Sequence, residues 1–120
     1  MNKIRMIALA ACMAATLDAS AQEQEIRLFS HRGGRMEHDE NTLSAFQASY
    51  DAGYRGFETD IRMTRDGALV ITHDSSLERT TDGTGTVEEK TEAEIRQLAT
   101  KQGNKMMFLD ELLEFLKGKE

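Results

Sequence analysis

The sequence predicts an α/β fold, because strand patterns and helix patterns follow one another along the chain. Residues 25–30 alternate polar and apolar side chains, residues 56–61 form a second strand pattern, and helical spacing of apolar residues lies between them. The length of 120 residues suits one small domain or a piece of a larger one. A net charge of -6 without a Lys/Arg-rich block argues against nucleic-acid binding through a basic face.

Residues 1–21 have the pattern of a signal peptide. Lys3 and Arg5 give a basic start, residues 6–17 form an apolar run too short to span a bilayer, and residues 19–21 read Ala-Ser-Ala, an A-x-A cleavage site. The sequence therefore predicts export to the periplasm or the cell exterior. An amphipathic N-terminal helix is the alternative interpretation.

A functional domain over residues 22–120 would remain after cleavage, with Gln22 as its first residue. It has no stable membrane span and no Cys, hence no disulfide and no thiolate metal site. Residues 9–12 also match a bacterial lipoprotein box. In that second interpretation Cys12 carries a lipid anchor.

The first strand and the first helix each carry polar candidates at one end. His31 stands at the C-terminal end of the 25–30 strand, before a glycine loop. Asn41 or Thr42 can cap the helix that Gly53 ends. Glu40 precedes that helix, where its carboxylate is equally consistent with capping and with a functional role.

The second strand carries two acids, Glu58 and Asp60, which alternation places on one face. If that face is wet, two acids are ordinary; if it points inward, they repel each other and need a cation. The apolar run 68–72 predicts a third strand that is buried on both faces. The short connection favours a hairpin, and a turn centred on residues 65–66 would place Glu58 opposite His73 and Asp60 opposite Ile71.

The rest of the chain predicts a loop and two helices. Residues 79–85 form a polar, glycine-punctuated turn. Thr91 and Glu94 form a capping box for a helix that ends near Leu98. Apolar spacing over 108–116 predicts another helix, whose Met-Phe-Leu face belongs to the core.

The motifs together resemble the N-terminal portion of the glycerophosphodiester phosphodiesterase family, within the phospholipase-C-like phosphodiesterases. The resemblance rests on motifs in the family's order and spacing: His31-Arg32-Gly33, Glu40-Asn41-Thr42, Glu58-Thr59-Asp60, Thr64-Arg65-Asp66-Gly67, His73-Asp74 and Arg79-Thr80-Thr81-Asp82-Gly83-Thr84-Gly85. It implies a TIM-type (β/α) barrel. Since such a barrel needs on the order of 250 residues, the resemblance implies the N-terminal part of one, truncated after about three strands, with strand edges prone to aggregate.

The family resemblance also implies a reaction, the hydrolysis of glycerophosphodiesters to sn-glycerol 3-phosphate and an alcohol. In it, His31 and His73 would be the general acid and base, and Arg32 would hold the substrate phosphate. The residue chemistry agrees, because a guanidinium grips two phosphate oxygens and imidazoles exchange protons near neutral pH.

A divalent metal, Ca²⁺ or Mg²⁺, is implied at Glu58 and Asp60, with Glu40 supporting the site. Hard oxygen ligands suit these ions better than zinc. The family's third metal carboxylate would lie on a later strand. Two departures from the family pattern are Asp39 in place of a proline and residues 107–108 in place of Pro-Thr.

Two other functions are compatible with the sequence. One is a non-catalytic secreted fragment that keeps residual metal or anion binding. The other is a related activity of the lysophospholipase-D type. The Glu40-Asn41-Thr42 motif and the Arg79-Thr80-Thr81 motif favour the glycerophosphodiester reaction over the second of these.

Overall fold

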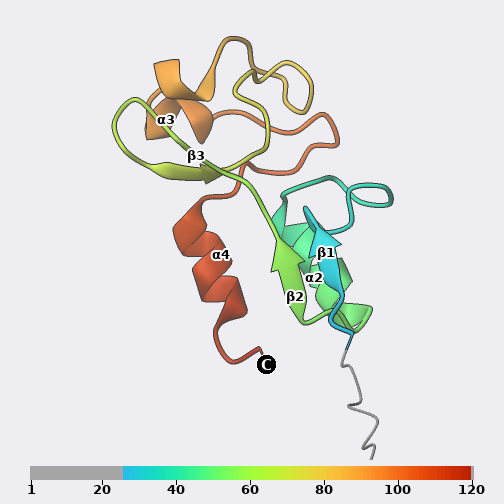
Figure 1. The fold of residues 1–120 in the computed structure, drawn as a ribbon. Helices are drawn as coiled ribbons and strands as arrows, with labels where there is room; N and C mark the ends of the chain where they lie inside the picture. Colours follow the sequence, from blue (N-terminus) through green and yellow to red (C-terminus); the bar gives the residue numbers. More distant parts are fainter. Residues whose placement is uncertain (1–25, 120) are drawn as a thin grey trace, which may run out of the picture.

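The computed structural model of this chain describes residues 26–119 (Figure 1). The predicted signal peptide and Cys12 lie outside the described residues. The elements are, in chain order, β1 (Phe29–His31), α2 (Leu43–Asp51), β2 (Gly56–Glu58), β3 (Ile61–Met63), β4 (Leu69–Ile71), the 3₁₀ helix η1 (Val87–Glu89), α3 (Glu92–Ile95) and α4 (Leu109–Leu116). The strands form two two-stranded sheets, and in Figure 1 the β1–β2 pair lies beside α2 and α4, below the β3–β4 hairpin and α3.

The first sheet is the beginning of a strand–helix–strand unit. β1 and β2 run parallel, with His31 opposite Glu58, and α2 connects them. Thr42 caps α2 as predicted, its Oγ1 accepting from the Ala45 N–H at 3.3 Å. β1 is shorter than the predicted 25–30 strand and includes His31. A parallel pair joined by a helix is the repeating unit of a (β/α) barrel, and residues 26–119 contain no closed barrel.

The predicted strand over residues 56–61 is wrong in one respect, because it is broken in two. β2 ends at Glu58, and β3 begins at Ile61 in the other sheet. Asn41 holds both residues of the break: its Oδ1 accepts from Thr59 Oγ1 at 2.9 Å and its Nδ2 donates to Asp60 Oδ2 at 3.1 Å. Glu58 and Asp60 therefore do not share a strand face.

The predicted hairpin is confirmed, but the predicted register is wrong by one residue. Ile61 pairs with Ile71, and the Thr72 N–H donates to the Asp60 carbonyl at 3.0 Å. The turn is centred later than assumed because Thr64 Oγ1 accepts from the Ala68 N–H at 2.9 Å. Because the strand breaks after Glu58, Glu58 pairs with His31 in the other sheet and does not lie opposite His73.

Two hydrophobic clusters lie on the two faces of β4, as the continuous apolar run predicted. Val70 belongs to a cluster of six buried residues, Val70, Leu77, Val87, Ile95, Met106 and Phe108. Ile71 belongs to a second cluster of Phe46, Ile71, Met107 and Leu112. The segment 106–108 alternates between the clusters in the same way, and the Ile71 N–H donates to the Met107 carbonyl at 2.8 Å. Val70 and Ile71 are thus fully buried, whereas Leu69 at the start of β4 is 39% exposed, and β4 is shorter than the predicted strand over 68–72.

The helices of the second half agree in part with the sequence. Thr91 and Glu94 form the predicted capping box, but α3 ends at Ile95 instead of near Leu98. α4 has Phe108 as its N-cap, and Phe108 and Leu112 are buried, which confirms the core role of this segment. In residues 26–119, no helix has the length and apolar character needed to cross a bilayer.

Candidate active site

The backbone after β1 turns sharply beneath α2. Arg32 has a φ of 52°, which is uncommon for a residue with a side chain, and Gly33 has a φ of 77°. A Cβ on Gly33 would lie 2.8 Å from the Ala45 Cβ, so only glycine fits. The Arg32 N–H is held by Glu58, to whose carbonyl it donates at 3.0 Å and to whose Oε2 at 3.2 Å. Such strained positions concentrate at functional sites.

The Arg32 side chain is buried between two acids. Its Nη1 donates to Glu40 Oε1 at 3.3 Å, and its Nε lies 3.2 Å from Asp60 Oδ2. That second contact is an ion pair without hydrogen-bond geometry. Among the described residues, Arg32 Nε is the one buried side-chain nitrogen or oxygen without a hydrogen-bond partner. A buried donor left in this state costs about 1–3 kcal/mol.

Glu40 lies between two guanidinium groups. Arg79 donates to both of its oxygens, from Nη1 to Oε2 at 3.0 Å and from Nη2 to Oε1 at 2.7 Å. The Arg79 hydrogen bonds lower the pKa of Glu40 despite its partial burial, and Arg32 adds to this effect. Glu40 is therefore engaged by arginines, and α2 is capped by Thr42 instead.

The two predicted metal ligands come from the strand break. The contacts described for Glu58 and Asp60 fall on Oε2 and Oδ2, which leaves Oε1 of Glu58 and Oδ1 of Asp60 as oxygens for a ligand. Residues 26–119 contain no group of three or more His, Cys, Asp or Glu side chains that could hold a metal ion. Two carboxylate oxygens are nevertheless a donor set that suits Mg²⁺ or Ca²⁺, which complete their shells with water or substrate oxygens.

The two predicted catalytic histidines are held differently. His31 Nε2 lies 3.6 Å from Glu58 Oε2, and the His31 side chain is 54% exposed. His73 Nδ1 lies 2.6 Å from Asp74 Oδ1. Arg62 Nε also donates to the His73 carbonyl at 2.8 Å, which fixes the backbone there. The structure thus places His31 beside Glu58, one of the two predicted metal ligands, and His73 beside a separate carboxylate, that of Asp74.

Sequence reasoning assigned no role to Asp74 or Arg79. Arg79 Nε donates to Asp74 Oδ2 at 2.5 Å, so Arg79 contacts both Asp74 and Glu40. Hydrogen bonds from Arg79 and then from His73 lower the pKa of Asp74, and the two carboxylates raise the pKa of Arg79. The signal that could have identified them was their place in the family motifs, Asp74 in His73-Asp74 and Arg79 at the start of the 79–85 motif. Otherwise the 79–85 stretch has the composition of a turn.

Asp39, the residue that departs from the family pattern, ties the Glu40 loop to the later part of the chain. Its Oδ2 accepts from Thr100 Oγ1 at 2.5 Å and from Asn104 Nδ2 at 2.7 Å. Its carbonyl accepts from Thr42 Oγ1 at 2.7 Å. Asp39 therefore joins the segment before α2 to the 99–105 loop.

Comparisons with known proteins agree on one family. Residues 31–119 match the model of the glycerophosphoryl diester phosphodiesterase family. A glycerophosphodiester phosphodiesterase of Caldanaerobacter subterraneus is 41% identical over 71 residues, which are 59% of this chain and 29% of that protein.

Solved structures give the same result. A glycerophosphodiester phosphodiesterase from Agrobacterium tumefaciens superimposes with a TM-score of 0.75 at 34% identity, over 79% of this chain and 44% of that one. An Oleispira antarctica phosphodiesterase in complex with its product sn-glycerol-3-phosphate has a TM-score of 0.72 at 32% identity, over 76% of this chain and 40% of that one. These structures are TIM barrels, so the described fold is an N-terminal part of a barrel. The chain spans less than half the length of each of these relatives.

Proposed function

The chain belongs to the glycerophosphoryl diester phosphodiesterase family, and we propose on that premise that its residues serve the hydrolysis of glycerophosphodiesters to sn-glycerol 3-phosphate and an alcohol. The observation that carries the proposal is the joint placement of Arg32, Glu58 and Asp60 at the end of the parallel strand pair. The carboxyl ends of barrel strands are where barrel enzymes place their chemistry. The Oleispira relative with bound sn-glycerol-3-phosphate supports the substrate class.

Arg32 is proposed to hold the phosphate of the substrate. A guanidinium presents several N–H donors in one plane and can bind two phosphate oxygens at once. Its ion pairs with Glu40 and Asp60 fix the guanidinium before substrate arrives. A guanidinium that does not need to reorganise stabilises developing negative charge more effectively than one that does.

Glu58 and Asp60 are proposed to hold a divalent cation, Ca²⁺ or Mg²⁺, through the oxygens Oε1 and Oδ1. When bound, the cation supplies positive charge beside the phosphate. The Arg32 N–H contributes by orienting the Glu58 carboxylate, and Asn41 Nδ2 orients that of Asp60. Such hydrogen bonds to ligating carboxylates set the direction of the free oxygens.

His73 and His31 are proposed as general base and general acid. Because Asp74 accepts from Nδ1 of His73, the Nε2 lone pair is available to take the proton of the attacking hydroxyl, from water or from the substrate itself. A new P–O bond forms to that oxygen while the P–O bond to the alcohol breaks. Attack by water gives sn-glycerol 3-phosphate directly, whereas attack by a hydroxyl of the substrate gives a cyclic phosphate, which water opens in a second step. His31 donates its proton to the leaving alkoxide oxygen, so that the alcohol departs neutral.

The test is hydrolysis of glycerophosphocholine by the chain from Gln22, in Ca²⁺, in Mg²⁺ and in EDTA. We expect metal-dependent turnover that falls by about 10²- to 10⁴-fold in His31→Ala and in His73→Ala. His38→Ala is the matched control, since His38 is an exposed histidine of the same loop region and has no proposed role. Activity that survives both active-site substitutions, or the absence of both turnover and sn-glycerol 3-phosphate binding, would contradict the proposal.

Export is the second part of the proposed function, and it rests on the signal-peptide pattern of residues 1–21. The mature protein would then act in the periplasm or outside the cell on small phosphodiesters. N-terminal sequencing of protein recovered from that compartment would find Gln22 first. A lipid on Cys12 would instead support the lipoprotein interpretation.

A further inference from the structure

Arg79 is the point at which two parts of the proposed site meet. Its Nη1 and Nη2 groups donate hydrogen bonds to Glu40, and its Nε donates one to Asp74. Beyond Glu40 lies Arg32, and beyond Asp74 lies His73. An unbroken series of charge-assisted hydrogen bonds therefore joins the proposed phosphate-binding group to the proposed base, and Arg79 is its central member.

We propose that Arg79 is a positioning residue, which holds His73 through Asp74 at a fixed place relative to Arg32 through Glu40. The inference rests on the proposed function for the roles of His73 and Arg32. General base catalysis requires the ring nitrogen within hydrogen-bond reach of the attacking oxygen. A base that is fixed relative to the phosphate site meets that requirement in every bound complex.

The loop that carries Arg79 is anchored independently of these ion pairs. Thr81 is buried, its N–H donates to the Leu77 carbonyl at 3.0 Å, and its Oγ1 donates to the same carbonyl at 2.7 Å. Backbone hydrogen bonds join this loop to the 99–101 segment. The Asp82 N–H donates to the Ala99 carbonyl at 3.0 Å, and the Lys101 N–H donates to the Thr80 carbonyl at 2.9 Å. The guanidinium thus projects from a backbone that is already fixed, which is what a positioning residue needs.

The ion pairs of Arg79 are explained better by a positioning role than by a general contribution to folding stability. The Arg79 side chain is 46% exposed, and exposed ion pairs contribute little to folding because water and salt screen them. The two acids are more enclosed, with 12% exposure for Glu40 and 24% for Asp74. Arginine also differs from lysine here, since a planar fork can serve two carboxylates at once and an ammonium cannot do so with the same geometry.

The direct test is the tautomer of His73, read from ¹⁵N shifts of its ring in NMR spectra and assigned with His73→Gln. In the wild-type chain we expect the Nδ1–H tautomer, because the Asp74 carboxylate can only accept. In Arg79→Gln and in Arg79→Lys, Asp74 loses its fixed partner, and the Nε2–H tautomer should gain population. Arg65→Gln is the matched control: Arg65 is an exposed arginine with one long contact, 3.7 Å, to Glu94.

A second arm separates positioning from local disturbance. Glu40 does not touch His73 or Asp74, so Glu40→Gln reaches the ring only through Arg79. We expect it to shift the tautomer in the same direction by a smaller amount. In a chain that hydrolyses substrate, Arg79→Lys should lower kcat by about tenfold to 100-fold with little change in KM.

The inference is overturned if wild-type His73 is the Nε2–H tautomer, a measurement that needs no variant. It is also overturned if Arg79→Lys keeps the wild-type tautomer and kcat, because charge alone would then suffice. Should Arg79→Gln fail to fold, the wild-type and Arg79→Lys spectra still decide. The tautomer can be read in the absence of turnover, so failure of the proposed hydrolysis is distinguishable from failure of this inference.

Discussion

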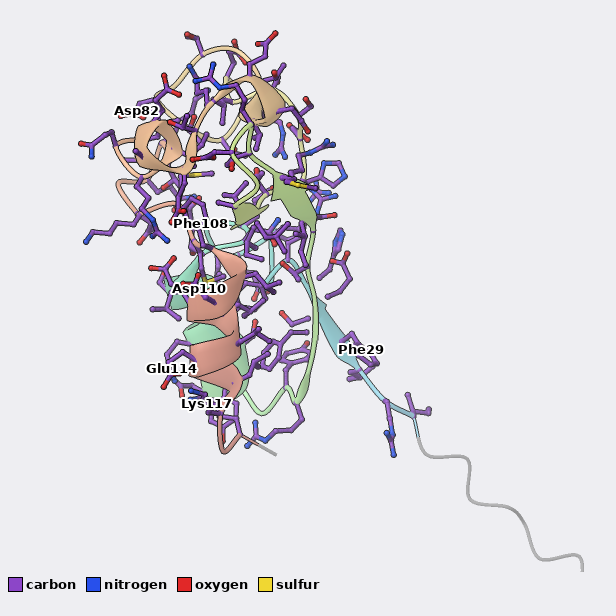
Figure 2. The ribbon with its side chains drawn as sticks, turned by 90° about the vertical axis from the view of Figure 1, so that its left-hand side faces the viewer. Phe29, Asp82, Phe108, Asp110, Glu114 and Lys117 are labelled. Atoms are coloured by element: carbon purple, nitrogen blue, oxygen red, sulfur yellow. The ribbon has the colours of Figure 1, made fainter. Side chains whose placement is uncertain are left out.

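Leu77, Val87 and Ile95, which pack against the inner face of the hairpin, have no exposed surface, whereas Leu28 and Phe29 at β1 are about two-thirds exposed. The two regions differ in how completely their apolar side chains are covered. Around the hairpin, η1, α3 and the 106–108 segment cover β4, and Phe108 pairs with Val70. The β1–β2 pair is covered on one face, where Phe57 packs against Phe46 of α2 and Phe115 of α4. In Figure 2 Phe29 lies apart from α2 and α4.

This difference applies to the proposed site as well, since each region supplies one histidine. His73 belongs to the closed region and has close partners for its ring and its carbonyl. His31 belongs to the open region, and the Glu58 carboxylate lies 3.6 Å from its ring. His73 is therefore held by residues of its own region, Asp74 and Arg62, whereas the orientation of His31 depends on what binds next to Glu58.

The largest effect should come from opening the closed cluster. Phe108 is 2% exposed, and Arg96 stacks on its ring at 4.0 Å. Phe108→Ala removes a large buried ring and leaves a cavity, so the free energy of unfolding should fall by about 3–5 kcal/mol in urea titrations. Leu113→Ala, on the exposed face of the same helix, is the control and should change it by less than about 0.5 kcal/mol. Equal effects of the two would remove the distinction between the regions.

The next effect concerns one of the contacts that tie the two regions together. Asp39→Ala removes the acceptor of Thr100, which is buried, and of Asn104. Leaving these donors unpaired should cost about 1–3 kcal/mol in the same titration. Asp51→Ala serves as control, because Asp51 makes an exposed contact with Gln47 within α2. A loss no greater than the control's would mean that the Asp39 contacts do not hold the two regions together.

The sequence predicted these regions unequally. The hairpin and its buried strand were predictable because a continuous apolar run and a nearby Asp-Gly turn are local signals. The break after Glu58 was not, since Asn41, distant in the chain, holds Thr59 and Asp60 there. The predicted register of the hairpin was also wrong. Because the turn was placed slightly too early, every predicted cross-strand pair was shifted by one residue.

The site shows the same limit. The candidate residues were visible as motifs, but the contacts among them were not. The contact of Arg79 with Glu40 spans 39 positions in the chain. No periodicity reports such a contact, so local composition alone could only describe the 79–85 stretch as a turn.

Acid should act on the two carboxylates that Arg79 links, Glu40 before α2 and Asp74 in the closed region. Hydrogen bonds from Arg79 lower the pKa of both Glu40 and Asp74 in the folded chain. Groups with a depressed folded pKa stabilise above their unfolded pKa values, about 4, and lose that contribution as pH falls through the folded values. Between pH 6 and pH 3 the wild-type chain should therefore lose about 1 kcal/mol more stability than Arg79→Gln, after discounting for exposure. Equal losses in urea titrations at both pH values would contradict the linkage.

The smallest effect should come from the open region, at Phe29. Its ring covers Gly56, where a Cβ would lie 2.7 Å from the ring, yet most of the ring faces solvent. Phe29→Ser should therefore change the free energy of unfolding by no more than about 0.5 kcal/mol. The corresponding change for Phe108→Ala is about 3–5 kcal/mol. An exposed apolar strand edge also favours association, so the substitution should raise the concentration at which sedimentation detects self-association. A loss of stability close to that of Phe108→Ala would mean that β1 is as firmly packed as the hairpin. The two regions would then differ in the exposure of their apolar side chains but not in how much packing stabilises them.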